Sequence, residues 1–143
     1  MTEKEKELLC KDICTRLPYG VKVGTTDNDG SLKNVWDVLW YNTYTEDVEL
    51  THSTEDANKM VDISEVKPYL FPLSSMTEEQ KREYNRRKHK IPVCRYEYGD
   101  VVSEEIELYD SPYSFEYLIE NHFDVYGLIP MGLAKDATNL NVY

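Results

Sequence analysis

The stretch LKNVWDVLWYNTY, residues 32–44, sets the fold class expected of this chain. It is rich in β-branched and aromatic residues, which is typical of a strand. Alternation would place Trp36, Val38 and Trp40 on one face of the strand. The other face would carry Val35, Leu39 and Tyr41, interrupted by Asp37. Because both faces carry apolar groups, we expect a central strand of a sheet that is covered on two sides.

Shorter strand signals lie on either side of this stretch. Residues 19–25 and 47–51 each fit one strand, and residues 27–30 (DNDG) have the composition of a tight turn. Residues 93–98 and 101–109 alternate around Gly99-Asp100, which predicts a β-hairpin with a two-residue turn. Residues 52–62 are expected to form a loop, and residues 69–71, between two prolines, to form a short extended or turn-like segment. Together these segments predict an antiparallel sheet of about four or five strands.

Three helices are expected around this sheet. The first spans residues 2–17, where Thr2 and Glu5 form a capping box and an apolar stripe ends before Pro18. The pairs Ser75 with Glu78 and Thr77 with Gln80 offer two overlapping capping boxes, so the second helix should run from about Thr77 to His89. It has so few apolar residues that it must be largely exposed.

The third helix begins at Ser111-Pro112, with proline at its first position. Its inward stripe is formed by Phe115, Leu118, Ile119 and either His122 or Phe123. Residues 126–134 (YGLIPMGLA) are apolar enough to pack back onto the body of the protein.

The composition indicates a single α+β domain that spans residues 1–143. The net charge is −11, and an acidic chain is repelled by nucleic acid and by anionic lipid. No apolar run approaches the ~18 residues of a membrane span and no signal-peptide pattern is visible, so we expect a protein that is cytoplasmic or delivered by an unrecognised route. Three cysteines (Cys10, Cys14 and Cys94) fit reduced thiols better than a disulfide framework.

A basic segment interrupts this acidic chain. Residues 81–95 (KREYNRRKHKIPVCR) hold seven of the sixteen Lys and Arg residues and one acid, Glu83. The segment fits either a solvated helix face with i, i+4 ion pairs or a docking surface for a partner. The candidate partner-binding residues are Lys81, Arg82, Tyr84, Arg86, Arg87, Lys88 and Lys90. The acidic remainder favours a protein partner over nucleic acid.

The sequence carries no established catalytic motif, and we assign no catalytic residue, metal ligand or cofactor. Cys10 and Cys14 are four residues apart on a helix, where core packing is favoured over zinc binding. Asp27, Asp29 and Gly30 match the start of a calcium loop, but Thr25 and Trp36 stand where acidic ligands are required. An aromatic ligand pocket near Trp36, Trp40, Tyr69 and His122 is a weaker hypothesis.

Three blocks of the sequence are familiar in combination: LCKDICTRLPYGVKV (9–23), VKPYLFPLSSMTEEQKREY (66–84) and HFDVYGLIPMGLAKDA (122–137). In order and position they resemble a family of small uncharacterised proteins carried by phages and prophages of gut bacteria. The chain departs from that family at Phe71, Val125-Tyr126 and Pro130-Met131, where the family often has charged residues. The resemblance implies a mobile-element accessory protein and no particular activity.

The function expected from these observations is binding without catalysis. The first hypothesis is a small acidic accessory protein that binds a host protein, for example to inhibit host defence. The alternatives are a nucleic-acid-associated protein that uses residues 81–95, and a small-molecule-binding protein.

Overall fold

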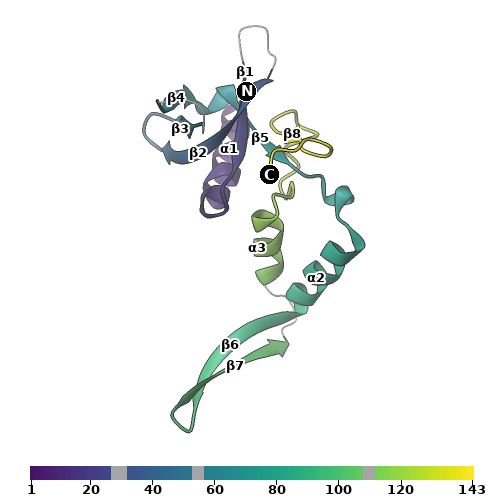
Figure 1. The fold of residues 1–143 in the computed structure, drawn as a ribbon. Helices are drawn as coiled ribbons and strands as arrows, with labels where there is room; N and C mark the ends of the chain where they lie inside the picture. The colour runs from purple at the N-terminus through teal and green to yellow at the C-terminus, as the bar shows by residue number, and fades with distance from the viewer. Residues whose placement is uncertain (27–31, 53–56, 108–111) are drawn as a thin grey trace.

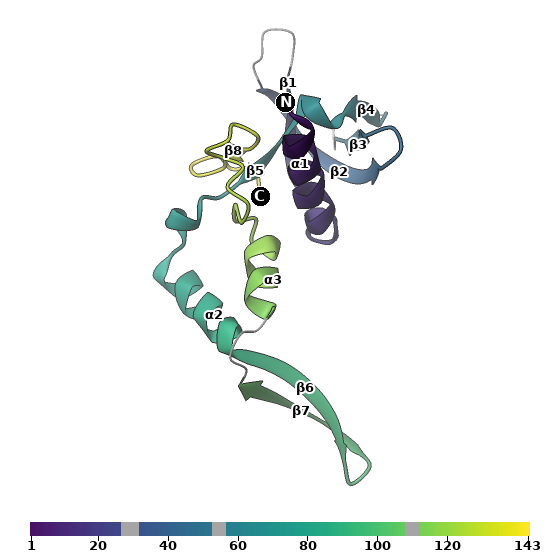
Figure 2. The ribbon, with the colours of Figure 1, turned by 180° about the vertical axis from the view of Figure 1, so that it is seen from behind.

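The chain folds into a body and a long arm that projects from it (Figures 1 and 2). The computed structural model spans residues 1–143 and describes all of them except 27–31, 53–56 and 108–111. For residues 32–33, 90–93 and 105–107 it describes the backbone but not the side chains. The body holds the N-terminal helix and the main sheet, whereas the arm holds two helices and a separate hairpin. The expected α+β class is confirmed, and the expected turn at residues 27–30 lies outside the described residues.

The main sheet has six strands in the order β4-β3-β2-β1-β5-β8. They are β1 (Lys22–Thr26), β2 (Leu32–Asn42), β3 (Asp47–Thr51), β4 (Lys59–Asp62), β5 (Val66–Leu70) and β8 (Lys135–Asp136). The prediction of four or five antiparallel strands was therefore wrong in two respects. β4 lies in the segment expected to be a loop, and β8 pairs with β5 in parallel.

Strand β2 contains an irregularity that changes which side chains face the core. Its register against β3 shifts between Val38 and Trp40, as in a β-bulge, which reverses the alternation of faces. Trp36 and Val38 are buried, Trp40 is exposed, and Tyr41 packs against the core in its place. The expectation that Trp40 shares the face of Trp36 was therefore wrong.

Helix α1 (Glu3–Arg16) packs against the main sheet and completes the principal core. The predicted capping box is present, since the Thr2 and Glu5 side chains each accept a hydrogen bond from the other's backbone N–H. Leu9 and Ile13 of the helix are fully buried with Val23 and Leu50 of the sheet. Residues 128–134 close this core, as the apolar tail predicted.

The arm runs out along α2 (Glu78–His89), turns through β6 (Lys90–Glu97) and β7 (Asp100–Glu107), and returns along α3 (Tyr113–Glu120). The hairpin forms a two-stranded sheet of its own and is not part of the main sheet. Because Glu97 pairs with Asp100, the two turn residues are Tyr98 and Gly99. Both have positive φ, as two-residue hairpin turns of this type require. The predicted hairpin is present, but its turn lies one residue earlier than expected.

The base of the arm is held by backbone pairing between its two ends. Phe71 N donates to His122 O (2.9 Å), and Asp124 N donates to Phe71 O (2.8 Å). A second core lies here, formed by Tyr117, Leu118 and Phe123 with Phe71 and Tyr84 packed against them. Phe115, which was expected to face inward with Leu118, is instead exposed.

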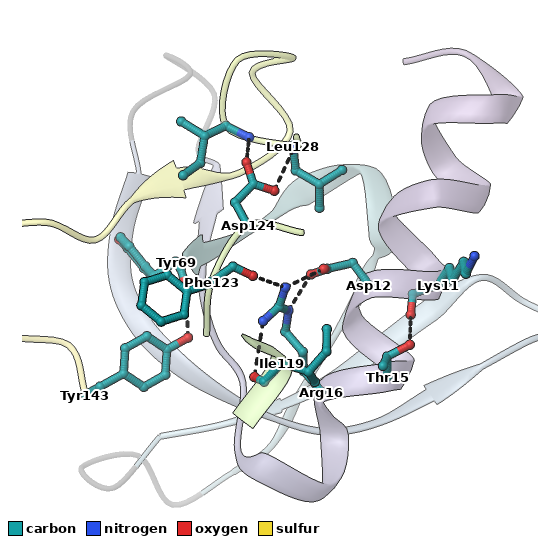
Figure 3. A network of polar contacts seen from close by, with 11 residues as sticks. Lys11, Asp12, Thr15, Arg16, Tyr69, Ile119, Phe123, Asp124, Leu128 and Tyr143 are labelled. Carbon is teal, nitrogen blue, oxygen red and sulfur yellow. Dashed lines mark hydrogen bonds and ion pairs between the residues drawn. The ribbon is translucent and has the colours of Figure 1, made fainter. Parts of the chain in front are cut away.

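A fully buried arginine joins α1 to the returning end of the arm (Figure 3). Arg16 makes a bidentate ion pair with Asp12, with hydrogen bonds of 2.9 and 2.8 Å. Its other N–H groups donate to the carbonyls of Ile119 (3.3 Å) and Phe123 (2.7 Å). Burial raises the pKa of the Asp12 carboxyl, and the hydrogen bonds and charge of Arg16 oppose that rise. The buried ion pair is therefore stable only while Arg16 keeps its hydrogen bonds to Asp12 and to the two carbonyls.

Replacing Arg16 by leucine is expected to lower the free energy of unfolding by about 3–5 kcal/mol, because Asp12 would remain buried without its counter-ion. Equilibrium urea denaturation followed by circular dichroism measures this loss. As the matched control, Lys81→Leu breaks the exposed Lys81–Glu78 pair and should cost less than about 1 kcal/mol. Equal losses for both variants would contradict the structural role of Arg16.

Candidate functional site

The basic segment lies on α2, which begins as the sequence predicted. Thr77 N donates to Gln80 Oε1 (2.8 Å), and Gln80 N donates to Thr77 Oγ1 (3.2 Å), so these residues form a capping box. None of the residues of α2 is buried, which confirms the expectation of an exposed middle helix. The helix holds five Lys or Arg residues and three Glu residues.

The acidic residues of α2 pair with its basic residues. Glu83 accepts hydrogen bonds from Arg86 (2.9 and 2.8 Å) and Arg87 (2.8 Å), which lower its pKa to about 2. Glu78 pairs with Lys81 at 2.9 Å. Three of the predicted contact residues are therefore already engaged within the protein.

Two of the predicted contact residues also hold the arm together. Arg87 donates to Glu120 of α3 (2.8 Å), and its guanidinium lies over the Tyr117 ring, 4.9 Å from the centroid. Tyr84 packs against the second core, so its ring is not an open platform for stacking. Arg87 and Tyr84 thus serve the contact between α2 and α3.

The remaining basic side chains do not form a continuous patch. Arg82 and Lys88 are exposed and make no ion pair with the described residues, while the side chain of Lys90 lies outside them. Strand β7 brings four acidic residues alongside β6, and Arg95 of β6 pairs with Glu104 at 3.4 Å. The fold therefore neutralises much of the charge that the sequence concentrates in residues 81–95.

The end of the hairpin presents two chemically different faces. On one face Tyr96 lies opposite Val101, next to the pair of Cys94 and Ser103. Tyr96 is 83% exposed, Val101 is 64% exposed, and Tyr98 at the turn is 99% exposed. The opposite face carries Arg95 with its ion-pair partners Glu97 and Glu104. Sequence reasoning missed this uncharged face, although the alternation of Tyr96 with charged neighbours was a usable signal.

The four residues of the predicted aromatic pocket lie in different environments. Trp36 is buried, with its ring 5.4 Å from that of His52, and its Nε1 has no hydrogen-bond partner among the described residues. Trp40 is exposed and donates to Glu49. Tyr69 is buried in β5, and its carbonyl accepts a hydrogen bond from Tyr143.

His122, the fourth of these residues, lies beside a hollow at the base of the arm. The hollow has a volume of about 390 Å³ and is lined by residues that precede α2, by the start of α2, by the end of α3 and by the C-terminal segment. Trp36, Trp40 and Tyr69 do not line it. The sequence predicted one wall of this hollow and not the others, because the segments meet only through the tertiary fold.

The conformation and environment of His122 are unusual. Its backbone adopts a left-handed conformation (φ 60°) just after α3, a position that usually favours glycine. Its ring stacks on Tyr143, with the ring centroids 3.8 Å apart, and its Nδ1 is buried with no hydrogen-bond partner among the described residues. Burial and the charges of Arg16 and Lys22 lower its pKa to about 4, so the ring is neutral at neutral pH.

Two further groups have side chains capable of chemistry, the Asp124 carboxylate and the thiols of Cys10 and Cys14. Asp124 accepts hydrogen bonds from the backbone N–H groups of Leu128 (2.8 Å) and Ile129 (2.9 Å), which fixes the turn of the tail (Figure 3). Cys10 packs against the principal core, whereas Cys14, which was also expected to pack there, is exposed. Their sulfurs are 4.0 Å apart, and desolvation raises the pKa of Cys14 to about 11, which disfavours a reactive thiolate. Within the described part of the chain, no group of three or more His, Cys, Asp or Glu side chains is arranged to hold a metal ion.

Comparison with protein-family models, curated proteins and solved structures finds no match to this chain. None of the helices among the described residues has the length and apolar character needed to cross a membrane. The assignment of function therefore depends on the geometry of the arm and of its base.

The low pKa of His122 predicts a pH-dependent loss of stability. An unfolded histidine titrates near 6.5 and the folded one near 4, so between these values only the unfolded state takes up the proton. The free energy of unfolding should fall by about 2 kcal/mol from pH 7 to pH 5 through this group. His122→Asn, which tolerates the left-handed backbone, should remove this decrease, and His89→Asn should retain it. Urea denaturation at each pH measures the difference, and parallel pH profiles for wild type and His122→Asn would overturn the assignment.

Proposed function

We propose that this protein is a non-enzymatic binding protein that engages a partner protein through the end of the β6–β7 hairpin. The observation that carries the proposal is the exposed, uncharged face of Tyr96 and Val101 at the end of a projecting arm. A two-stranded ribbon on its own is marginally stable in water, and none of the side chains described between residues 94 and 104 is buried. Burial against a partner supplies the apolar contact that this ribbon lacks.

The composition of the tip favours one kind of partner. Tyrosine is enriched at protein interfaces because its ring buries a large apolar area and its hydroxyl remains hydrogen-bonded. Beside the three exposed residues Tyr96, Tyr98 and Val101, the turn carries the two acids Glu97 and Asp100. The best fit is a groove with an apolar floor and a basic rim.

The resemblance to phage and prophage proteins extends this proposal to a biological setting. On that basis the partner is a host protein in the host cytoplasm, and inhibition of a host defence protein is the outcome we favour. An inhibitor of this kind needs no catalytic residue, since occupation of the groove is sufficient to block it.

Nucleic acid is the weaker candidate. Lys81, Arg86 and Arg87 are paired with acids of the arm, and Arg87 and Tyr84 hold α2 against α3. The acidic residues of β7 lie alongside the basic residues of β6 and oppose phosphate binding.

Site-specific photo-crosslinking tests the proposed face directly. A benzophenone amino acid at position 98 should crosslink one protein in a host lysate, whereas the same group at position 44 should not. Tyr44 is 97% exposed and lies in the turn between β2 and β3, so it matches Tyr98 in exposure but not in place. Crosslinking of the same proteins from both positions would overturn the proposal.

Paired hairpin variants then measure the contribution of each face to the captured interaction. Tyr96→Thr with Val101→Thr should weaken binding by about 30-fold or more, because both interface side chains are truncated. Arg95→Thr with Val102→Thr changes the neighbouring cross-strand pair on the opposite face and should alter the Kd by less than about threefold. Biolayer interferometry with the crosslinked protein measures both, and equal losses would contradict a one-sided contact.

Nucleic-acid binding is checked by fluorescence anisotropy with a labelled 20-nucleotide single strand at low salt. We expect no saturation up to about 100 μM protein. A tighter complex that weakens steeply with salt and is abolished by Arg82→Ser with Lys88→Ser would favour the nucleic-acid function instead.

A further inference from the structure

The hollow at the base of the arm has features of a ligand site that the proposed binding function does not use. Its described lining includes the rings of Phe71, His122, Phe123 and Tyr143, and the centroids of Phe71 and Tyr143 are 6.0 Å apart. Phe71 is half-buried, and Tyr143 is 41% exposed with one face of its ring stacked on His122, so the other face is the one that a ligand would contact. The volume of about 390 Å³ is within the range of small-molecule sites.

Hydrogen-bonding groups of both kinds converge on the same hollow. Gln80 uses its Oε1 to cap α2, which leaves its side-chain NH₂ without a partner among the described residues. Asn121 uses its NH₂ to bond Tyr117 O (2.9 Å), which leaves its Oδ1 as an acceptor. Asn139 makes no side-chain hydrogen bond with the described residues, so its whole amide is available. The hollow thus offers donors and acceptors beside aromatic faces.

The electrostatics exclude strongly charged ligands. Among the described side chains that line the hollow, Glu120 is the one carboxylate, and it pairs with Arg87 at 2.8 Å. His122 is uncharged at neutral pH because burial lowers its pKa to about 4. A neutral, planar molecule with hydrogen-bonding edges is therefore favoured over a phosphate or a carboxylate.

We propose that this hollow binds a neutral purine base or nucleoside, with the base against Phe71 and Tyr143 and its edge hydrogen-bonded by the Gln80, Asn121 and Asn139 amides. Asn and Gln side chains match the paired donor and acceptor of an adenine edge, and aromatic rings stack on its faces. No Lys or Arg is among the described residues that line the hollow, which separates this site from a nucleotide phosphate site.

Heteronuclear NMR with adenosine as the probe tests the proposal on the intact protein. The side-chain NH₂ signals of Gln80, Asn121 and Asn139 and the backbone signal of Tyr143 should shift with one common Kd. Benzimidazole, which has a similar planar shape but lacks the adenine amine and pyrimidine edge, should bind about tenfold more weakly. No shift at millimolar adenosine, or shifts centred on the hairpin, would overturn the proposal.

Two variants test the amide contacts while preserving local structure. Gln80→Glu keeps the oxygen that caps α2 but removes the NH₂ donor, and Asn139→Gly keeps the left-handed backbone but removes the side chain. Each should weaken adenosine binding by about tenfold. Asn85→Asp adds the same charge to α2 as Gln80→Glu, outside the lining of the hollow, and should leave the Kd within about twofold. Unchanged binding in both test variants would refute amide recognition.

Discussion

The buried pair of Arg16 and Asp12 is the interaction on which the arrangement of body and arm depends. Asp12 and Arg16 are one turn apart on α1, yet the remaining donors of Arg16 reach the carbonyls of Ile119 and Phe123, more than a hundred residues later. Ile119 lies in the last turn of α3, and Phe123 lies in the segment that follows this helix. One side chain therefore ties the end of α3 and the segment after it to the N-terminal helix. Because the desolvated pair is stable only with all its partners, the end of the arm has little freedom to move relative to the body.

The same use of charge inside the protein explains why the basic segment is a poor candidate for partner binding. Arg87 contacts Glu83 on its own helix, and Glu120 and the Tyr117 ring on α3, so it contributes to holding α2 against α3. The net charge of residues 81–95 suggests free basic side chains, but these ion pairs engage several of them within the protein. On the uncharged face of the hairpin, Tyr96 and Val101 pair only across the two strands and remain largely exposed. Partner binding is accordingly proposed for Tyr96 and Val101 rather than for the arginines.

Local signals in the sequence predicted the local elements well, and long-range contacts account for what they missed. The capping boxes at Thr2 and Thr77 and the alternation of β6 and β7 depend on neighbours within a few residues, and these elements are present. Strand β8 was missed because two residues acquire strand geometry only by pairing with β5. The exposure of Trp40 was missed because it follows a register shift against β3 that its own stretch does not encode. The hollow was predicted only at His122, because its walls come from three segments that are distant in sequence, residues 71–80, 120–123 and 138–143.

The hairpin has two unpaired edges, which raises the question of whether a partner would extend its sheet or pack on its face. β6 contains Pro92, which has no N–H to donate, and β7 carries Glu104, Glu105 and Glu107 close together. Proline and clustered charge are features that protect edge strands against pairing with other chains. Backbone addition along either edge is thereby disfavoured, whereas the face of Tyr96 and Val101 has no such protection. The chemistry of the edges thus directs contact to the side chains at the end of the arm, far from the base hollow, so the two proposed sites can act independently.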